Sequence, residues 1–181
     1  ERIDSLLAIR AIHEQYGHVQ EIIVQNFRAK PETKMMNAPE PDLNELLWTI
    51  AIARLIFGPT MSVQAPPNLS PGVLPQIVHA GINDWGGVSP VTPDFVNPEA
   101  PWPHLDELAR ETASAGKFLT ERLTMYPDYA VDLDRWAHPD LHVRMLEMID
   151  AEGFPRIDEW CPGDVDIAPP SEVMNAIVNS P

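Results

Sequence analysis

Apolar residues along the chain follow two alternating patterns. Segments with apolar residues every three or four positions are typical of helices, whereas short continuous apolar runs are typical of strands buried on both faces of a parallel sheet. Glycine, proline and polar residues separate these segments. The expected helices cover residues 3–16, 43–57, 71–80 (with Pro71 in the first turn), 105–116 and 139–151; the expected strands cover 19–27, 61–65 and a segment that begins within 82–88; and 118–129 is expected to be extended or irregular.

The alternation of strands and helices predicts right-handed parallel β/α units, and therefore an α/β fold rather than a meander or a sandwich. In such folds, ligands bind at the carboxyl ends of the strands. Polar residues occur near the end of each expected strand, so we expect them to gather at one edge of the sheet although they are far apart in sequence. These residues are Gln25, Asn26, Gln64, Asn68, Asn83 and Asp84.

Residues 82–103 combine polar side chains with glycines and prolines in a way that no simple structural demand explains. Gly86 and Gly87 allow close backbone approach or positive φ, and five prolines fix φ and remove backbone donors. Such a loop loses little entropy when it orders around a ligand. Two interpretations stay open at this stage: a binding loop, and a rigid connection that wraps the end of a sheet. Thr92 and Asp94 are expected to form an ordinary turn through their side chains.

Length and charge limit the possible functions. A chain of 181 residues suffices for one domain but is short for a closed (β/α)8 barrel, which needs roughly 250. A formal net charge of -15 argues against nucleic acid or an anionic membrane as a partner, because both attract clustered Lys and Arg. No apolar run approaches the roughly 20 residues that span a bilayer, and no secretory signal opens the chain, so we expect a cytoplasmic protein.

Thiol and imidazole groups offer little chemistry of their own. Cys161 is the single cysteine, so this chain contains neither a disulfide framework nor the thiolates for an iron–sulfur cluster, and we interpret Cys161 as structural. His138 and His142 have the spacing with which two ligands share a helix face. Pro139 places His138 at or before the start of a helix, so a solvated helix end is the favoured interpretation over a metal site.

Four ordered motifs resemble one enzyme family. Together they span most of residues 1–130, and four motifs of this length are a specific signal. The family is the radical S-adenosylmethionine enzyme FO synthase, or 7,8-didemethyl-8-hydroxy-5-deazariboflavin synthase, and the resemblance is to its ring-closing subunit or domain. The matching segments are 19–31 (VQEIIVQNFRAKP), 46–59 (LLWTIAIARLIFGP), 64–70 (QAPPNLS) and 82–103.

One departure from this family is decisive. The family holds a 4Fe-4S cluster through a CxxxCxxC loop after the first barrel strand, and this sequence contains no such loop. The resemblance therefore implies the C-terminal part of a (β/α) TIM-type radical S-adenosylmethionine barrel, with parallel strands six to eight and their helices, and a cluster loop that would precede Glu1. Residues 1–152 would form this partial barrel. Residues 153–181 would form an acidic, Pro-rich tail or interdomain linker with at most a short helix at 171–178.

The resemblance also implies a reaction. The complete enzyme would make the deazaflavin chromophore from tyrosine and 5-amino-6-ribitylaminouracil, using S-adenosylmethionine and the cluster. The ring would close on a hydroxybenzyl–ribityliminouracil adduct, and a tyrosine-cleaving domain or subunit would be the partner. The six polar residues listed above would bind uracil, ribityl or adenosyl groups, although Gln25 and Asn83 could instead cap neighbouring backbone groups. The segment alone would be inactive, and its open sheet edges would promote self-association. The alternative is a non-catalytic β/α scaffold or interaction module.

Overall fold

The computed structural model describes residues 1–89 and 91–156 and divides them into two compact units. The first unit covers Glu1–Leu119, and the second begins at Thr120. Each unit is described by itself. The predicted helix at 171–178, Cys161 and most of the predicted tail lie outside the described residues.

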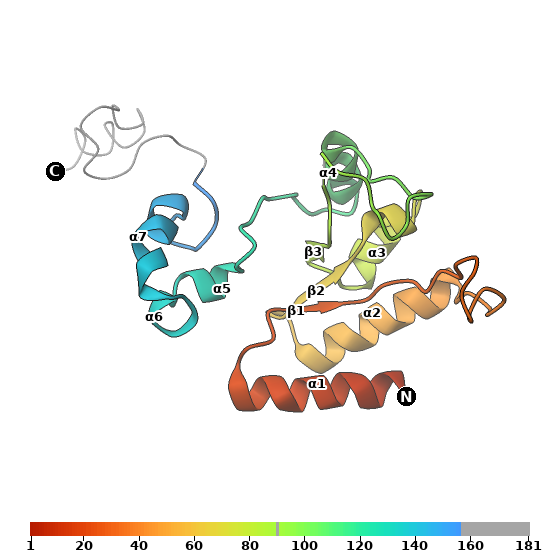
Figure 1. Cartoon of the computed structure of the whole chain (residues 1–181), viewed down its shortest axis with the longest axis horizontal. Helices are drawn as coiled ribbons and strands as arrows, with labels where there is room; N and C mark the ends of the chain where they lie inside the picture. The colour runs from red at the N-terminus through yellow and green to blue at the C-terminus, as the bar shows by residue number, and fades with distance from the viewer. Residues whose placement is uncertain (90, 157–181) are drawn as a thin grey trace. The chain divides into compact units, whose positions relative to one another are not determined.

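A three-stranded parallel sheet forms the centre of the first unit (Figure 1). Strand β2 lies between β1 and β3, and Ile22 pairs with Val63 while Gln64 pairs with Asp84. The predicted α/β class with parallel strands is confirmed. The strands are β1 (Glu21–Ile23), β2 (Ser62–Ala65) and β3 (Asp84–Trp85).

Of the described helices of the first unit, one precedes the first strand, two connect the strands and one follows the last strand. They are α1 (Arg2–Tyr16), α2 (Leu43–Phe57), α3 (Leu74–Ala80) and α4 (Leu105–Ser114), with a 3-10 turn, η1 (Pro67–Leu69), directly after β2. Helix α2 begins at Asp42, whose side chain accepts a hydrogen bond from the Glu45 N–H and so satisfies one of the free donors of the first turn. Helix α2 packs against both α1 and α3.

Only one face of the sheet is fully covered. Ile22 and Val63 point into the apolar core, where Ile50 of α2 and Ile77 of α3 are completely buried. On the opposite face the side chain of Ile23 is 54% exposed. Because side chains alternate along a strand, the sheet is buried against helices on one side and open on the other.

The guanidinium group of Arg54, in the last turn of α2, links the end of α2 to the segments that precede β2 and β3. It donates to the backbone carbonyls of Gly58, Met61 and Gly81 and to the Oδ1 atom of Asn83, each at 2.7 Å. Burial lowers the pKa of this guanidinium from its ordinary value, but an arginine stays charged in any folded protein. Arg54 therefore fixes the end of α2 against the segments that lead into β2 and β3.

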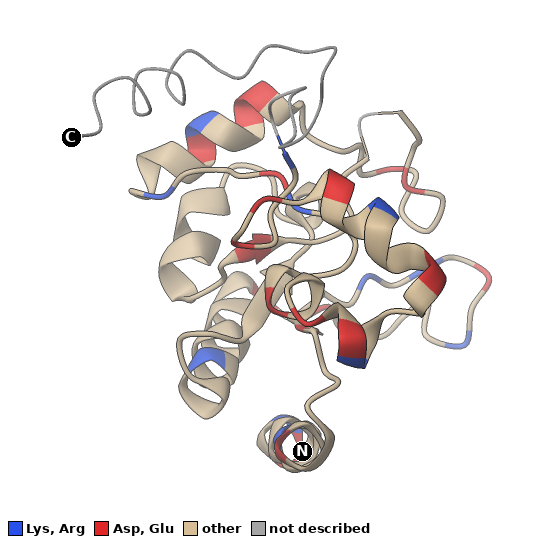
Figure 2. Cartoon of the chain, turned by 90° about the vertical axis from the view of Figure 1, so that its left-hand side faces the viewer, with Lys and Arg blue, Asp and Glu red and all other residues tan. Residues whose placement is uncertain are grey.

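The described part of the second unit, up to residue 156, contains three short helices. They are α5 (Pro127–Ala130), α6 (Leu133–Trp136) and α7 (Pro139–Met148). The rings of Tyr129 and Trp136 lie 4.8 Å apart and connect α5 to α6. Gly153 approaches the backbone of Pro127 so closely that a β-carbon would lie 2.6 Å from its carbonyl oxygen. Figure 2 shows acidic and basic residues spread over helices and loops.

Several predicted boundaries are wrong. The first strand is limited to Glu21–Ile23 instead of 19–27, and the third is limited to Asp84–Trp85. Helix α3 begins at Leu74, so Pro71 lies in the preceding turn and Pro75 occupies the first helical turn. The segment 118–129 is irregular at first, as expected, but α5 begins within it.

We expect Arg54→Lys to destabilise the protein by about 2–3 kcal/mol, because a lysine cannot donate to four acceptors and leaves buried carbonyls unpaired. The measurement is the urea dependence of unfolding, followed by circular dichroism. The matched control is Arg10→Lys, which alters an exposed pair with Glu14 and should change the free energy of unfolding by less than about 0.5 kcal/mol. Equal effects of the two substitutions would contradict this account of Arg54.

Candidate functional site

Three loops leave the carboxyl ends of the strands (Figure 1). Side chains at that edge tie these loops together. The Arg28 guanidinium, after β1, donates to the carbonyl oxygen of Leu69, after β2, at 2.6 Å. Lys30 forms an ion pair with Glu99 in the loop after β3. Parallel pairing brings these loops to one edge, and the two cations hold them there.

The cations at this edge are already paired with carboxylates. Arg28 lies 2.8 Å from Glu40, and this hydrogen bond, assisted by the Ala29 N–H, lowers the pKa of the Glu40 carboxyl. The Lys30 ammonium lowers the pKa of Glu99 in the same way. The positive charge of the loops is therefore largely neutralised within the loops themselves.

Two of the predicted site residues, Asn26 and Asn68, lie in these loops. The Nδ2 atom of Asn26 donates to the Ser70 hydroxyl at 3.1 Å. The Nδ2 atom of Asn68 donates to Asp94 Oδ2 and to the Ala100 carbonyl, both at 2.9 Å. In both residues the Oδ1 atom is buried and has no partner among the described residues.

Asp94 organises the loop after β3. Its Oδ1 atom accepts from the backbone N–H groups of Val96 and Asn97, and its Oδ2 atom accepts from the Asn97 and Asn68 side chains. These hydrogen bonds, with that from the Asn97 side chain contributing most, lower the pKa of Asp94 to about 2. The predicted side-chain turn is confirmed for Asp94, and Thr92 contributes a hydroxyl bond to Ser89.

Gln64 and Asp84 share the open face of the sheet, since they are paired across β2 and β3. The Gln64 side chain is only 3% exposed and donates to the Glu21 carboxylate of β1. Gly86 lies directly against it, and a β-carbon at that position would overlap Gln64 Oε1. The close approach expected of Gly86 is therefore present. Glycine leaves the space that the Gln64 amide occupies.

Gln25 and Asn83 do not join either group. Gln25 is exposed, and no described residue contacts it through a hydrogen bond. The Oδ1 atom of Asn83 accepts from the Val63 N–H at 2.9 Å and from Arg54. Asn83 precedes β3 instead of following it, because β3 begins only at Asp84, so the expected clustering of Asn83 with the loop residues is wrong.

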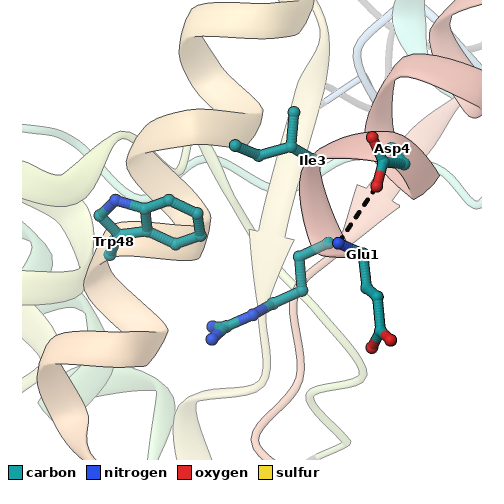
Figure 3. Close-up of a pocket in the computed structure, with 5 residues that line it drawn as sticks. Glu1, Ile3, Asp4 and Trp48 are labelled. Carbon is teal, nitrogen blue, oxygen red and sulfur yellow. Dashed lines mark ion pairs between the residues drawn. The ribbon is translucent and has the colours of Figure 1, made fainter.

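A second surface feature lies apart from these loops. Figure 3 shows an open depression between the start of α1 and α2, lined by Glu1, Arg2, Ile3, Asp4 and Trp48. The Arg2 guanidinium lies 5.3 Å from the centre of the Trp48 ring and also pairs with Glu45. These contacts explain the depression as the junction of two helices, and no group in it has a chemistry that suggests catalysis.

The described residues contain no group of three His, Cys, Asp or Glu side chains that could hold a metal ion. His138 caps α7 by accepting a hydrogen bond from the Asp140 N–H, as expected of a helix end. His142 lies beside the Ala137 carbonyl at 3.2 Å. In the part of the chain that the structure describes, no helix is both long and apolar enough to cross a bilayer.

A parallel sheet with polar loops tied together at its carboxyl edge defines an α/β protein, and in this class ligands bind at that edge. Comparison with curated proteins gives the family. The chain is 50% identical to FO synthase of Mycobacterium tuberculosis over 158 residues, and 46% identical to FO synthase of Streptomyces coelicolor over 159 residues. It is 51% identical to 7,8-didemethyl-8-hydroxy-5-deazariboflavin synthase of Methanopyrus kandleri over 156 residues.

By sequence, the chain corresponds to a segment of FO synthases, and the predicted family resemblance is confirmed. These matches cover 86–87% of this chain. The chain spans only 18% of the Mycobacterium and Streptomyces relatives and 46% of the Methanopyrus relative. No protein-family model and no solved structure matches it.

The low pKa of Asp94 predicts how the loop responds to acid. A carboxyl whose pKa is lowered on folding contributes stability that is present above its unfolded value of about 4 and is lost as the pH falls toward 2. Asp94→Asn should therefore reduce the pH dependence of the free energy of unfolding between pH 5 and 2 by about 1 kcal/mol, allowing for partial exposure.

The measurement is urea unfolding of both proteins at several pH values. Asn97→Ala serves as a companion variant, because it removes the hydrogen bond that contributes most to the lowered pKa of Asp94 and should reduce the same pH dependence. An unchanged pH dependence in Asp94→Asn would show that this carboxyl is not held in its ionised form by the loop.

Proposed function

We propose that this chain is the part of an FO synthase that forms one side of its substrate and cosubstrate pocket. The observation that supports this most strongly is the identity of about 50% to FO synthases over most of the chain. The arrangement of the first unit agrees with it, because the three loops that would face a ligand all lie at the carboxyl edge of one parallel sheet.

The complete protein would be a radical S-adenosylmethionine enzyme that forms the deazaflavin chromophore from tyrosine and 5-amino-6-ribitylaminouracil. A hydroxybenzyl–ribityliminouracil adduct would be the species that closes the ring, supplied with a tyrosine-cleaving partner domain or subunit. A location in the cytoplasm is part of this proposal.

The donor set of this chain does not fit the cluster that the family requires. A 4Fe-4S cluster needs several thiolates, and the sequence contains one cysteine, Cys161. No step through the cluster is therefore assigned to these residues, which would contribute binding and orientation instead. The thiolates and most contacts to S-adenosylmethionine would come from other parts of the complete protein.

The sheet would be the part of a barrel that contains strands six to eight. Two features support this placement. The face of the sheet opposite the helices is open, with Ile23 exposed, and the open face carries polar groups such as Gln64 and Asp84, as the inner face of a barrel with a ligand would. Residues 1–152 would belong to this barrel, and residues 153–181 would form a tail or a link to another domain.

Four of the six predicted residues have positions that suit ligand binding. Asn26 and Asn68 offer unpaired amide oxygens at the loop edge, and Gln64 and Asp84 face the open side of the sheet. Gln25 is exposed at the same edge, so it would bind a ligand only as the complete barrel closes over it. Asn83 would have a structural role and no contact with the ligand, because its Oδ1 atom already accepts hydrogen bonds from Arg54 and from the Val63 N–H.

The test uses the complete protein that contains this segment, together with the tyrosine-cleaving partner where that is a separate subunit, reconstituted anaerobically with iron and sulfide and supplied with S-adenosylmethionine, a reductant and the two substrates. We expect deazaflavin, detected by its fluorescence and mass, together with deoxyadenosine. The 181-residue segment alone should produce neither. A complete protein that assembles a cluster but forms no deazaflavin would contradict the proposal and favour a scaffold or interaction module.

A pair of matched variants extends this test to the segment itself. Gln64→Leu should lower kcat/KM at least tenfold, because it removes a buried amide from the open face of the sheet. Gln76→Leu changes an exposed glutamine of α3 in the same way and should leave kcat/KM within about twofold. Equal kcat/KM values of the two variants would show that Gln64 does not contribute to the pocket.

A further inference from the structure

Asn68 presents an unusual polar atom at the carboxyl edge of the sheet. The residue is 5% exposed, and both hydrogens of its Nδ2 atom are used, one by Asp94 and one by the Ala100 carbonyl. Its Oδ1 atom is buried without a partner among the described residues. Buried polar atoms in native proteins nearly always have a hydrogen-bond partner. The unpaired Oδ1 atom therefore indicates a position where a hydrogen-bond donor from outside the described residues would bind.

The direction of this amide is fixed by its surroundings. An asparagine side chain can often be turned by 180° because its nitrogen and oxygen atoms look alike. Here both partners of Nδ2, an ionised carboxylate and a backbone carbonyl, can only accept hydrogen bonds. Turning the amide would place an acceptor against two acceptors, so the unpaired atom at position 68 must be an acceptor.

Asp94 sets this direction without being available to a ligand itself. Its two oxygen atoms accept four hydrogen bonds, from two backbone N–H groups and from the side chains of Asn97 and Asn68. These bonds also keep it ionised, since they lower its pKa to about 2. A group that remains an acceptor at every physiological pH keeps Asn68 in one orientation.

Asn26 provides a second unpaired oxygen, with a weaker constraint. Its Nδ2 atom bonds the Ser70 hydroxyl, which can donate as well as accept, so the Asn26 amide is free to turn. Ser70 is buried and stands two residues after Asn68, so both asparagines belong to the same part of the loop edge. One fixed acceptor and one adaptable amide are therefore available there.

Charge at this edge restricts the ligand further. Arg28 is paired with Glu40, and Lys30 is paired with Glu99. The neighbouring cations are thus neutralised, and the unpaired atoms are acceptors, so a phosphate or carboxylate would find no free partner among these groups. A neutral group that carries hydroxyl or N–H donors fits the two oxygen atoms.

We propose that Asn68 and Asn26 form an acceptor subsite that binds hydroxyl or N–H groups of a neutral ligand moiety, and that Asp94 is a positioning residue that fixes the direction of the Asn68 amide. The subsite rests on the function proposed above. Within it, two sources of such donors exist: the ribityl or uracil groups of the hydroxybenzyl–ribityliminouracil adduct, and the ribose of S-adenosylmethionine.

The test measures equilibrium binding of each compound separately to the complete, cluster-loaded protein by calorimetry, without reductant, and then KM and kcat with both compounds. Asn68→Ala should weaken binding of one compound at least tenfold and raise its KM by a similar factor, with a smaller effect on kcat. Asp94→Asn should shift the same constant in the same direction, because it allows the Asn68 amide to turn. Asn26→Ala should have a smaller effect on the same compound.

Ser89→Ala is the matched control, because it removes turn hydrogen bonds from the same loop without touching Asn68 or Asp94. It should change neither dissociation constant more than about twofold. Circular dichroism shows whether each variant is folded, and if Asn68→Ala is not, Asn26→Ala and Asp94→Asn decide the question.

The outcomes separate the sources of the donor. Weaker binding of the ribityl compound alone assigns the subsite to the pyrimidine substrate, and weaker binding of S-adenosylmethionine alone assigns it to the ribose. Unchanged binding of both in folded variants overturns the inference and leaves a water molecule as the partner of Oδ1. A wild-type protein that makes no deazaflavin and binds neither compound overturns the proposed function and this subsite with it.

Discussion

Backbone hydrogen bonds on both sides of β2 determine the rest of the first unit. The Val24 N–H donates to Gln64 on one side at 2.8 Å, and the Asn83 and Gly86 N–H groups donate to Val63 and Ala65 on the other, at 3.1 and 3.2 Å. Parallel pairing forces the chain to return through helices after each strand, so α2 and α3 must cover one face. It also places the ends of all three strands at one edge, where the polar loops meet.

One face of this sheet contributes to the stability of the fold, and the other is the proposed binding face. Ile22 and Val63 are buried against the helices, and Arg54 pairs with the carbonyls of Gly58, Met61 and Gly81 that packing alone would leave unpaired. The opposite face holds Gln64 and Asp84 and buries little apolar surface. The relatives are longer than this chain, and the proposed barrel would use the open face as the wall of its pocket.

Periodicity and turn residues were sufficient to predict the α/β class, the order of the strands and main helices in the first unit and the parallel direction of the strands, but not α5 and α6. They were not sufficient to place the ends of the strands, and for this reason Asn83 was wrongly expected to lie with the residues of the loop edge. The short strand β3 is fixed by pairing with β2 and by the bond from Arg54, and nothing local in the sequence marks Asn83 as the residue before it. The link from Asp94 to Asn68 also joins residues 26 apart, and Ser70 and Arg54 carry no local signal of their contacts. Such long-range hydrogen bonds become visible only in three dimensions.

The central claim is that the loops at the carboxyl edge of this sheet form part of the ligand pocket of an FO synthase. Hydrogen exchange of the complete protein, with and without saturating hydroxybenzyl–ribityliminouracil adduct and S-adenosylmethionine, tests it most directly. The account predicts slower exchange in residues 24–42, 66–73 and 86–104 when the ligands are bound, with little change in α1. Protection confined to regions outside these three loops, at saturating ligand, would contradict it.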